Sequence, residues 1–231
     1  MITNLIVLEE KKATTIVLFL KVAFLVFLCV EIYGEYIENR EMQYATKPFL
    51  MPLLAAVYLL TAQKASKLYL SALFFNWMAN LLFISSNLKS LIIASCFFLI
   101  YRSLILFKIF KDKRKLSVIP IVLGAIPFLF MFLSLINLVN ENIHGGDFYV
   151  VVFQALLMTL LGGFSLANYV VFNSIKSKLL LISSLFFGIN LFTLGVKFYY
   201  IDFLFLKSLS MIFFALGHIT FYYFMILKEE N

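Results

Sequence analysis

The stretch Thr46-Lys47-Pro48-Phe49-Leu50-Met51-Pro52-Leu53-Leu54 opens a run of apolar residues that continues to Leu60. Proline is favoured in the first turn of a helix, because the N–H that it lacks would have no partner there. A lysine directly before it can extend its ammonium group to the membrane surface while its aliphatic stem stays in lipid. We therefore predict a membrane helix that begins at Pro48, with Lys47 at the interface.

The composition outside this stretch is also that of a membrane protein. The 231 residues are 63% hydrophobic and 13% charged, and 28 of them are Phe. Water-soluble domains are about 45–50% apolar and about 25% charged. Segments that cross lipid must be helices or strands of a closed barrel, and the polar–apolar alternation of barrel strands is absent. The predicted fold class is all-α, with a single integral membrane domain over residues 1–231.

Apolar segments of the length needed to cross a bilayer recur along the whole chain. Crossing roughly 30 Å of hydrocarbon takes about 20 residues in a helix. The second segment is short, so it needs flanking residues or thinner lipid to cross. The brief connections predict that consecutive helices are antiparallel neighbours. The eight predicted spans are residues 14–33, 48–61, 68–84, 90–107, 117–139, 148–172, 179–199 and 203–227.

Lysine and arginine concentrate in every second connection. The positive-inside rule therefore predicts that both termini are cytoplasmic, and we expect a bacterial inner (plasma) membrane. The same distribution accounts for the net charge of +7 without a nucleic-acid partner. These cations are Lys11, Lys12, Lys64, Lys67, Lys108, Lys111, Lys113, Arg114, Lys115, Lys176, Lys178 and Lys228.

Polar and ionisable residues inside the spans are the candidate site residues. An ionisable group at mid-bilayer costs about 2.5–3.5 kcal/mol on insertion scales, so each one suggests a function. Position along the spans predicts two depths. Toward the outer face lie Glu31, Lys47, Asn76, Asn80, Gln154, Asn190 and Lys197, and toward the inner face lie Lys21, Arg102 and His218.

Two polar stripes could form the wall of a pocket open to the outer leaflet. Asn76 and Asn80 are four residues apart, hence on one face of a helix, and Ser183, Asn190 and Lys197 recur every seven residues. The alternative is that the amides only hydrogen-bond across packed helices, for about 0.6 kcal/mol each. For Glu31 and Lys197, near span ends, interfacial pairing is the equivalent alternative.

The deeper Arg102 and His218 pose a different question. Arginine does not lose its proton, so Arg102 needs a carboxylate, several carbonyls or a lipid phosphate. A single histidine either bridges helices or takes part in catalysis. Gly163 and Ala167 form a small-xxx-small pair that predicts close helix packing. We predict no metal site and no cofactor, and interpret His144-Gly145-Gly146-Asp147 as a turn.

Eight spans, the Lys47-Pro48 pair and polar dyads in the third and seventh spans resemble the lysoplasmalogenase-type (YhhN-like) family of membrane proteins. The resemblance implies hydrolysis of the vinyl ether of lysoplasmalogens, with a membrane lipid or lysophospholipid as partner. The family's Gly-Asp falls on Ala79-Asn80, and its Ser-Asp falls on Ile189-Asn190. Its aromatic-x-x-x-His element would fall on Phe98 to Arg102, with arginine in place of histidine.

These departures affect the chemistry. Vinyl-ether hydrolysis begins with protonation of the alkene carbon, and water then attacks the oxocarbenium ion. The reaction needs an acid and a base, but both presumed carboxylates are amides here, and Glu31 is the acid that remains within the membrane. The resemblance thus implies a divergent member whose site contains Asn80, Asn190, Lys47 and Glu31.

Three functional hypotheses remain open at this point. The first is a hydrolase of the family's type, and the second is a non-catalytic protein that binds or moves a lipid-like molecule. The third is a structural subunit of another membrane protein. The candidate residues are Asn80, Asn190, Lys47 and Glu31 for catalysis, and Asn76, Gln154, Lys197, Arg102 and His218 for substrate binding. The oligomeric state stays open.

Overall fold

The computed structural model describes residues 2–85, 88–111, 116–143 and 145–229. Four residues discussed above lie outside these ranges: Lys113, Arg114 and Lys115 of a predicted cytoplasmic connection, and His144 of the predicted turn. The described residues form helices joined by short turns, with no strand among them. The helices are α1 (Ile2–Tyr36), α2 (Arg40–Thr61), α3 (Lys67–Phe83), α4 (Leu88–Phe110), α5 (Val118–Val139), α6 (Gly146–Phe172), α7 (Ile175–Tyr199) and α8 (Leu204–Glu229).

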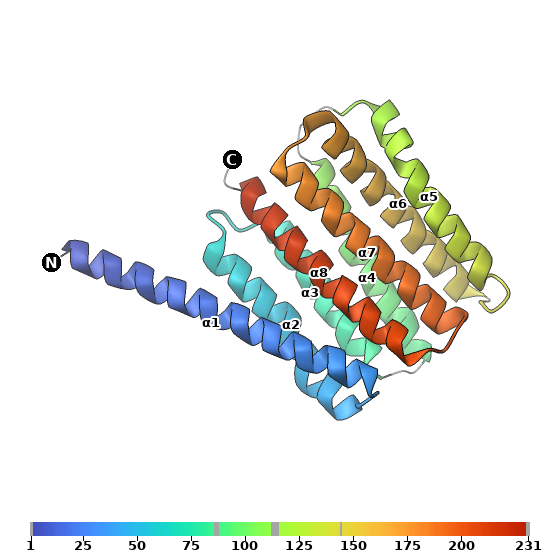
Figure 1. Ribbon diagram of the computed structural model, residues 1–231, viewed down its shortest axis with the longest axis horizontal. Helices are drawn as coiled ribbons and strands as arrows, with labels where there is room; N and C mark the ends of the chain where they lie inside the picture. Colours follow the sequence, from blue (N-terminus) through green and yellow to red (C-terminus); the bar gives the residue numbers. More distant parts are fainter. Residues whose placement is uncertain (1, 86–87, 112–115, 144, 230–231) are drawn as a thin grey trace.

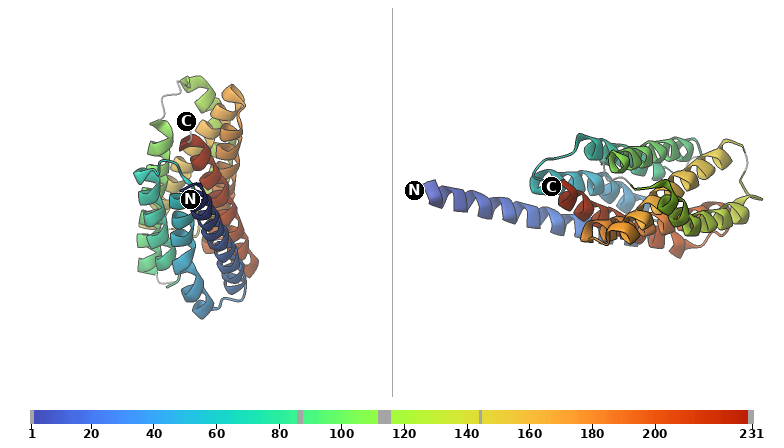
Figure 2. Two further views of the ribbon diagram at one scale, coloured as in Figure 1. Left: turned by 90° about the vertical axis from the view of Figure 1, so that its left-hand side faces the viewer. Right: turned by 90° about the horizontal axis from the view of Figure 1, so that it is seen from above.

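The helices form a bundle (Figure 1), and the contacts among seven of them close a ring. Going round the ring, α1 contacts α2, α2 contacts α3, α3 contacts α4, α4 contacts α6, α6 contacts α7, α7 contacts α8, and α8 returns to α1. Helix α5 lies outside the ring against α6 and α7, and the first half of α1 extends away from the bundle (Figure 2). The interior between α3–α4 and α7–α8 is therefore the place where side chains from distant segments meet.

Seven of the eight helices are long and apolar enough to cross a membrane. All except α3 qualify, and the surface agrees, because large apolar side chains such as Phe19 and Ile119 are 70% and 72% exposed. Charged side chains such as Glu31 and Lys47 are instead buried. This reversal of the usual pattern of soluble proteins supports an integral membrane protein.

One predicted neighbour relation is wrong. Consecutive helices do contact each other, except that the described parts of α4 and α5 do not, and α4 packs on α6 instead. The displacement of α5 follows from its partner surface: α5 and α6 approach so closely that a Cβ on Gly124 would lie 2.7 Å from the Gly163 carbonyl oxygen and 3.2 Å from the Ala167 nitrogen. The close packing predicted for Gly163 and Ala167 is thus confirmed.

Helix α2 corrects the prediction for its start. The helix begins at Arg40, eight residues before Pro48, and Asn39 caps it by accepting a hydrogen bond from the Met42 N–H at 3.1 Å. Both Pro48 and Pro52 lie inside the helix. An asparagine cap is a start signal as strong as a proline in the first turn, and here it determines the boundary. Lys47 is therefore within the bundle and not at the interface.

A tertiary hydrogen bond compensates for the second proline. Pro52 has no N–H, so the Pro48 carbonyl four residues earlier has no partner within the helix. The Trp77 indole N–H of α3 donates to that carbonyl at 2.8 Å. Because lipid supplies no alternative partner, this bond both permits Pro52 and fixes α2 against α3.

Candidate functional site

Four charged residues from three helices form what we call the charge cluster: the buried Glu31 and Glu35 of α1, the buried Lys47 of α2 and the partly exposed Lys207 of α8. Lys47 forms ion pairs with Glu35 and, at 3.3 Å, with Glu31. Lys207 Nζ lies 2.7 Å from Glu35 Oε2. Two acids and two bases are thus paired inside the protein, so the cluster has no net formal charge.

The sequence near the α1–α2 turn explains this arrangement. Glu31 and Glu35 are one helical turn apart and share a face of α1. The chain reverses at Glu38, which has a positive φ of 53°, so α2 returns antiparallel beside α1. Thr46 and Gln43 of α2 then donate to Glu31 and Glu35 respectively, the second bond at 3.0 Å. The cluster is a tertiary product of this hairpin and α8.

Uncharged polar groups connect α3 to α8 next to the cluster. The Asn80 amide donates to Asn76 Oδ1 at 3.2 Å, and the Asn76 amide donates to His218 Nε2 at 2.8 Å and to Met51 Sδ at 3.0 Å. His218 is fully buried against the rings of Tyr101, Phe187 and Phe214. The predicted separation of Asn76 and His218 into different depths is therefore wrong, because both lie near the middle of their helices.

A smaller pocket of about 50 Å³ brings together residues from six helices. Three of the predicted catalytic residues line it: Lys47, Asn80 and Asn190. Glu35 and Lys207 of the charge cluster are also in its wall. Glu31 contacts the pocket only through Lys47, to which it is paired.

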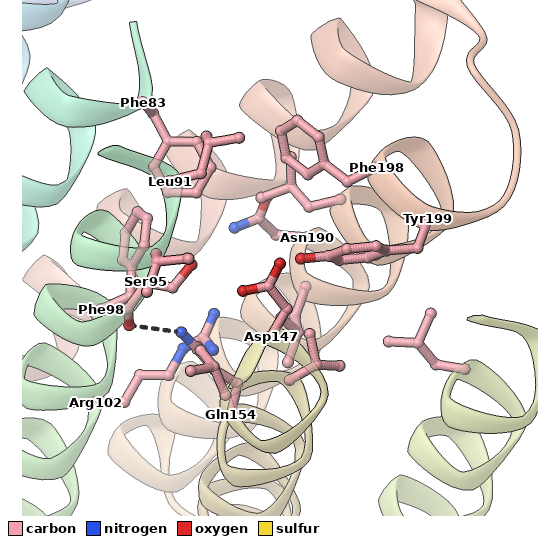
Figure 3. A pocket seen from close by; sticks show the side chains of 17 residues that line it. Phe83, Leu91, Ser95, Phe98, Arg102, Asp147, Gln154, Asn190, Phe198 and Tyr199 are labelled. Atoms are coloured by element: carbon pink, nitrogen blue, oxygen red, sulfur yellow. Dashed lines mark hydrogen bonds between the residues drawn. The ribbon is translucent and has the colours of Figure 1, made fainter. Parts of the chain in front are cut away.

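A larger cavity of about 190 Å³ adjoins the smaller pocket between α3, α4, α6 and α7. Its volume is more than ten times the roughly 10–15 Å³ that a water molecule needs. The wall is mostly apolar, with polar groups from Ser95, Arg102, Asp147, Gln154 and Asn190 (Figure 3). The two pockets share Phe83, Phe98, Asn190, Leu194 and Phe198.

Asn190 occupies the junction of the two pockets. Its amide points into the larger cavity in Figure 3, and no hydrogen bond to a described protein group engages it. A buried amide normally has partners. Asn190 is thus available to a molecule that enters either pocket.

Gln154 and Arg102 lie together at one end of the larger cavity, although Arg102 was predicted at the other depth. The Gln154 amide donates to the Ser95 carbonyl at 3.0 Å, the dashed line in Figure 3. Arg102 is 8% exposed and Gln154 is 5% exposed. Both side chains therefore face the cavity from within the protein.

Other candidates are placed away from the pockets. Lys197 pairs with the exposed Asp202, and neither residue lines either of the two pockets described above. Asn76 and His218 are bonded to each other and line neither pocket either. Lys21 lies over the rings of Tyr222 and Tyr223, 5.9 Å from each centroid, which is a cation–π arrangement.

The sequence interpretation missed two members of the charge cluster. Glu35 was not among the predicted site residues, yet it is 3% exposed and has three partners. Its spacing of four residues from Glu31 was the signal that both carboxylates face α2. No comparable signal identified Lys207, because its contact with Glu35 joins residues far apart in the chain.

No family model, curated protein or solved structure matches the chain.

Proposed function

We propose that the chain crosses a bacterial inner membrane eight times, with both termini in the cytoplasm. Helix α3 is the eighth span: its 17 residues extend about 25 Å at 1.5 Å per residue, and it lies between α2 and α4. An even number of crossings puts both termini on one side. The excess of Lys and Arg in the connections on that side supports the cytoplasm.

We further propose that the protein binds a lipid-like molecule inside the bundle without converting it. The observation that carries this proposal is the junction at Asn190, where a small pocket whose wall includes Lys47 and Asn80 adjoins a larger, mostly apolar cavity. An amphiphile needs such a combination, because its chain requires an apolar wall and its polar group requires hydrogen-bond partners. The free Asn190 amide supplies one such partner.

The experiment fills the shared wall and measures lipid binding. Leu194 lines both pockets, whereas Leu185 on the same helix is 43% exposed on the outer surface. We expect purified wild-type protein and Leu185→Trp to bind a labelled single-chain lysophospholipid saturably, and Leu194→Trp to lose at least about tenfold in affinity. Equal binding by both variants, or no saturable binding by wild type, would contradict the proposal.

A vinyl-ether hydrolase is the second candidate, and one observation favours it. The carboxylate of Glu35 lies in the wall of the smaller pocket beside Asn80 and Asn190, the positions at which the family resemblance implies an acid and a base. However, Lys47, Lys207 and Gln43 all donate to Glu35, so no described contact favours a proton on it. The first proton of the reaction therefore lacks an evident donor, and binding is the better supported function.

Incubation of alkenyl-lysophospholipid with purified protein separates the two candidates. We expect no fatty aldehyde above the level of a protein-free control at any pH. Aldehyde release by wild type that disappears in Glu35→Gln, with lipid binding retained, would favour the hydrolase.

A further inference from the structure

Arg102 is a buried cation in α4 whose charge no described residue compensates. Its side chain lies in the wall of the larger cavity and is more than nine-tenths buried. Its Nη1 has no hydrogen-bond partner, and no described carboxylate is within ion-pair distance of the guanidinium. Arginine remains protonated in proteins, and an unpaired charge away from water is strongly unfavourable. The folded protein thus presents an uncompensated positive charge to the cavity.

Gln154 of α6 presents a second unsatisfied group beside it. Its amide nitrogen donates to the Ser95 carbonyl, which fixes the orientation of the amide. The Oε1 atom is buried and has no donor among the described residues. Figure 3 places the Gln154 and Arg102 side chains next to each other at the same end of the cavity. A complementary molecule would therefore carry an anionic group, and a hydroxyl beside it would satisfy Gln154.

We propose that Arg102 is the binding site for the anionic head group, a carboxylate or a phosphate, of a single-chain amphiphile whose chain lies along the apolar wall of the larger cavity. Leu91, Ile92, Phe98, Val151 and Leu194 provide that wall. A charge-assisted, bidentate contact is the geometry that guanidinium groups form with both anions. The proposal rests on the proposed function, since it names the class of molecule that the cavity binds.

The lysines of the charge cluster are poorer anion sites, although Lys47 was among the candidate catalytic residues from the sequence. Lys47 is paired with Glu31 and Glu35, and Lys207 with Glu35. An anion at these lysines would displace a carboxylate or lie beside it, which like-charge repulsion disfavours. Arg102 has no such competitor.

Asp147 also lines the cavity, and its position determines which end takes the head group. It is half-exposed in the first turn of α6, seven residues and about 10 Å along the helix from Gln154, and it forms no ion pair with Arg102. Its negative charge disfavours an anion at its own end of the cavity. The head group therefore belongs at Arg102, and the chain lies along the apolar wall of the cavity.

The test compares ligands with the same chain and different head groups, using wild-type protein in neutral phosphatidylcholine nanodiscs. The probes are hexadecanoate, hexadecyl phosphate, hexadecanol, hexadecyltrimethylammonium and inorganic phosphate. We expect the two anionic amphiphiles to bind at least about tenfold more tightly than the alcohol and the cation. Inorganic phosphate should bind far more weakly than hexadecyl phosphate, because it gains no apolar contact.

Variants then assign the difference to Arg102. Arg102→Gln should remove the preference for anionic head groups while hexadecanol binding stays unchanged, and Arg102→Lys should restore part of it. Lys197→Gln, a buried lysine outside both pockets, is the matched control and should leave all affinities unchanged. Asp147→Asn should leave anion binding unchanged or strengthen it.

Several results would overturn the inference. If hexadecanol binds as tightly as hexadecanoate to wild type, or if Arg102→Gln keeps the preference, Arg102 is not the head-group site, and the proposed lipid binding still stands. Anion binding that weakens in Asp147→Asn would mean that this residue does not compete with the anion. Equal affinity for inorganic and hexadecyl phosphate would indicate a site for a free anion. If no amphiphile binds at all, the proposed function itself fails.

Discussion

The charge cluster and Arg102 are both buried charged sites inside a membrane bundle, but they differ in compensation. In the cluster every charge faces an opposite charge, and Thr46 and Gln43 add further hydrogen bonds. Arg102 lines the larger cavity, and its Nη1 has no hydrogen-bond partner among the described residues. The cluster joins α1, α2 and α8, whereas our proposal is that Arg102 binds a molecule from outside the chain.

The largest effect on stability that this comparison predicts is at the charge cluster. Lys47→Met would leave Glu31 with Thr46 as its remaining partner. Removal of one member of a buried pair typically costs about 3–5 kcal/mol, and we expect a loss of that size in unfolding measured in detergent micelles. The double variant Glu31→Gln/Lys47→Met should recover part of the loss. A loss below about 1 kcal/mol for Lys47→Met would mean that the cluster is not a structural unit.

At Arg102, whose charge has no described partner, we predict a change in stability of opposite sign. In lipid-free protein, Arg102→Met removes a buried charge that has no partner, so we expect stability to rise by about 1–2 kcal/mol. Addition of hexadecanoate should stabilise wild type but not the variant, because binding to the folded state adds to its stability. Destabilisation of lipid-free Arg102→Met would show that the guanidinium already has a partner, and the contrast with the cluster would disappear.

The smallest effect concerns an ion pair whose carboxylate is exposed, between the buried Lys197 and Asp202. Asp202, the partner of Lys197, has an 87% exposed side chain. Exposed pairs contribute about 0–1 kcal/mol, so Asp202→Asn should change the free energy of unfolding by less than about 1 kcal/mol. Added salt should make this change smaller still, because salt screens exposed charges. A loss of stability as large as that of Lys47→Met would mean that burial of the carboxylate does not explain why the charge cluster is more stabilising than the Lys197–Asp202 pair.

Much of the helical layout could be predicted from the sequence, because apolar length alone indicates membrane helices. Predicted and observed limits agree within a few residues for α3 to α8. They disagree at the starts of α1 and α2, where polar residues such as Arg40 and Gln43 continue the helix. Hydropathy does not register these turns as helical, since their stability comes from the Asn39 cap and from contacts with Glu35.

The candidate site could be predicted only in part. Lys47, Asn80 and Asn190 line one pocket, whereas Glu31, which was expected beside them, does not. Polar residues in lipid-crossing helices tend to face the interior of the bundle. Neither pocket includes Lys197 or His218 in its lining. Position along a helix gives approximate depth but not the direction in which the side chain faces.

The sequence by itself determined that this is a membrane protein. Its apolar segments are too long and too numerous for a water-soluble protein. In lipid, backbone N–H and C=O groups must be hydrogen-bonded within the protein, which requires helices here. Only the tertiary structure decided which buried charges are neutralised, since Lys47 and Lys207 meet Glu35 through contacts between distant segments. Electrostatic energy depends on distances in space, so the same tertiary contacts that pair these residues leave Arg102 facing a cavity.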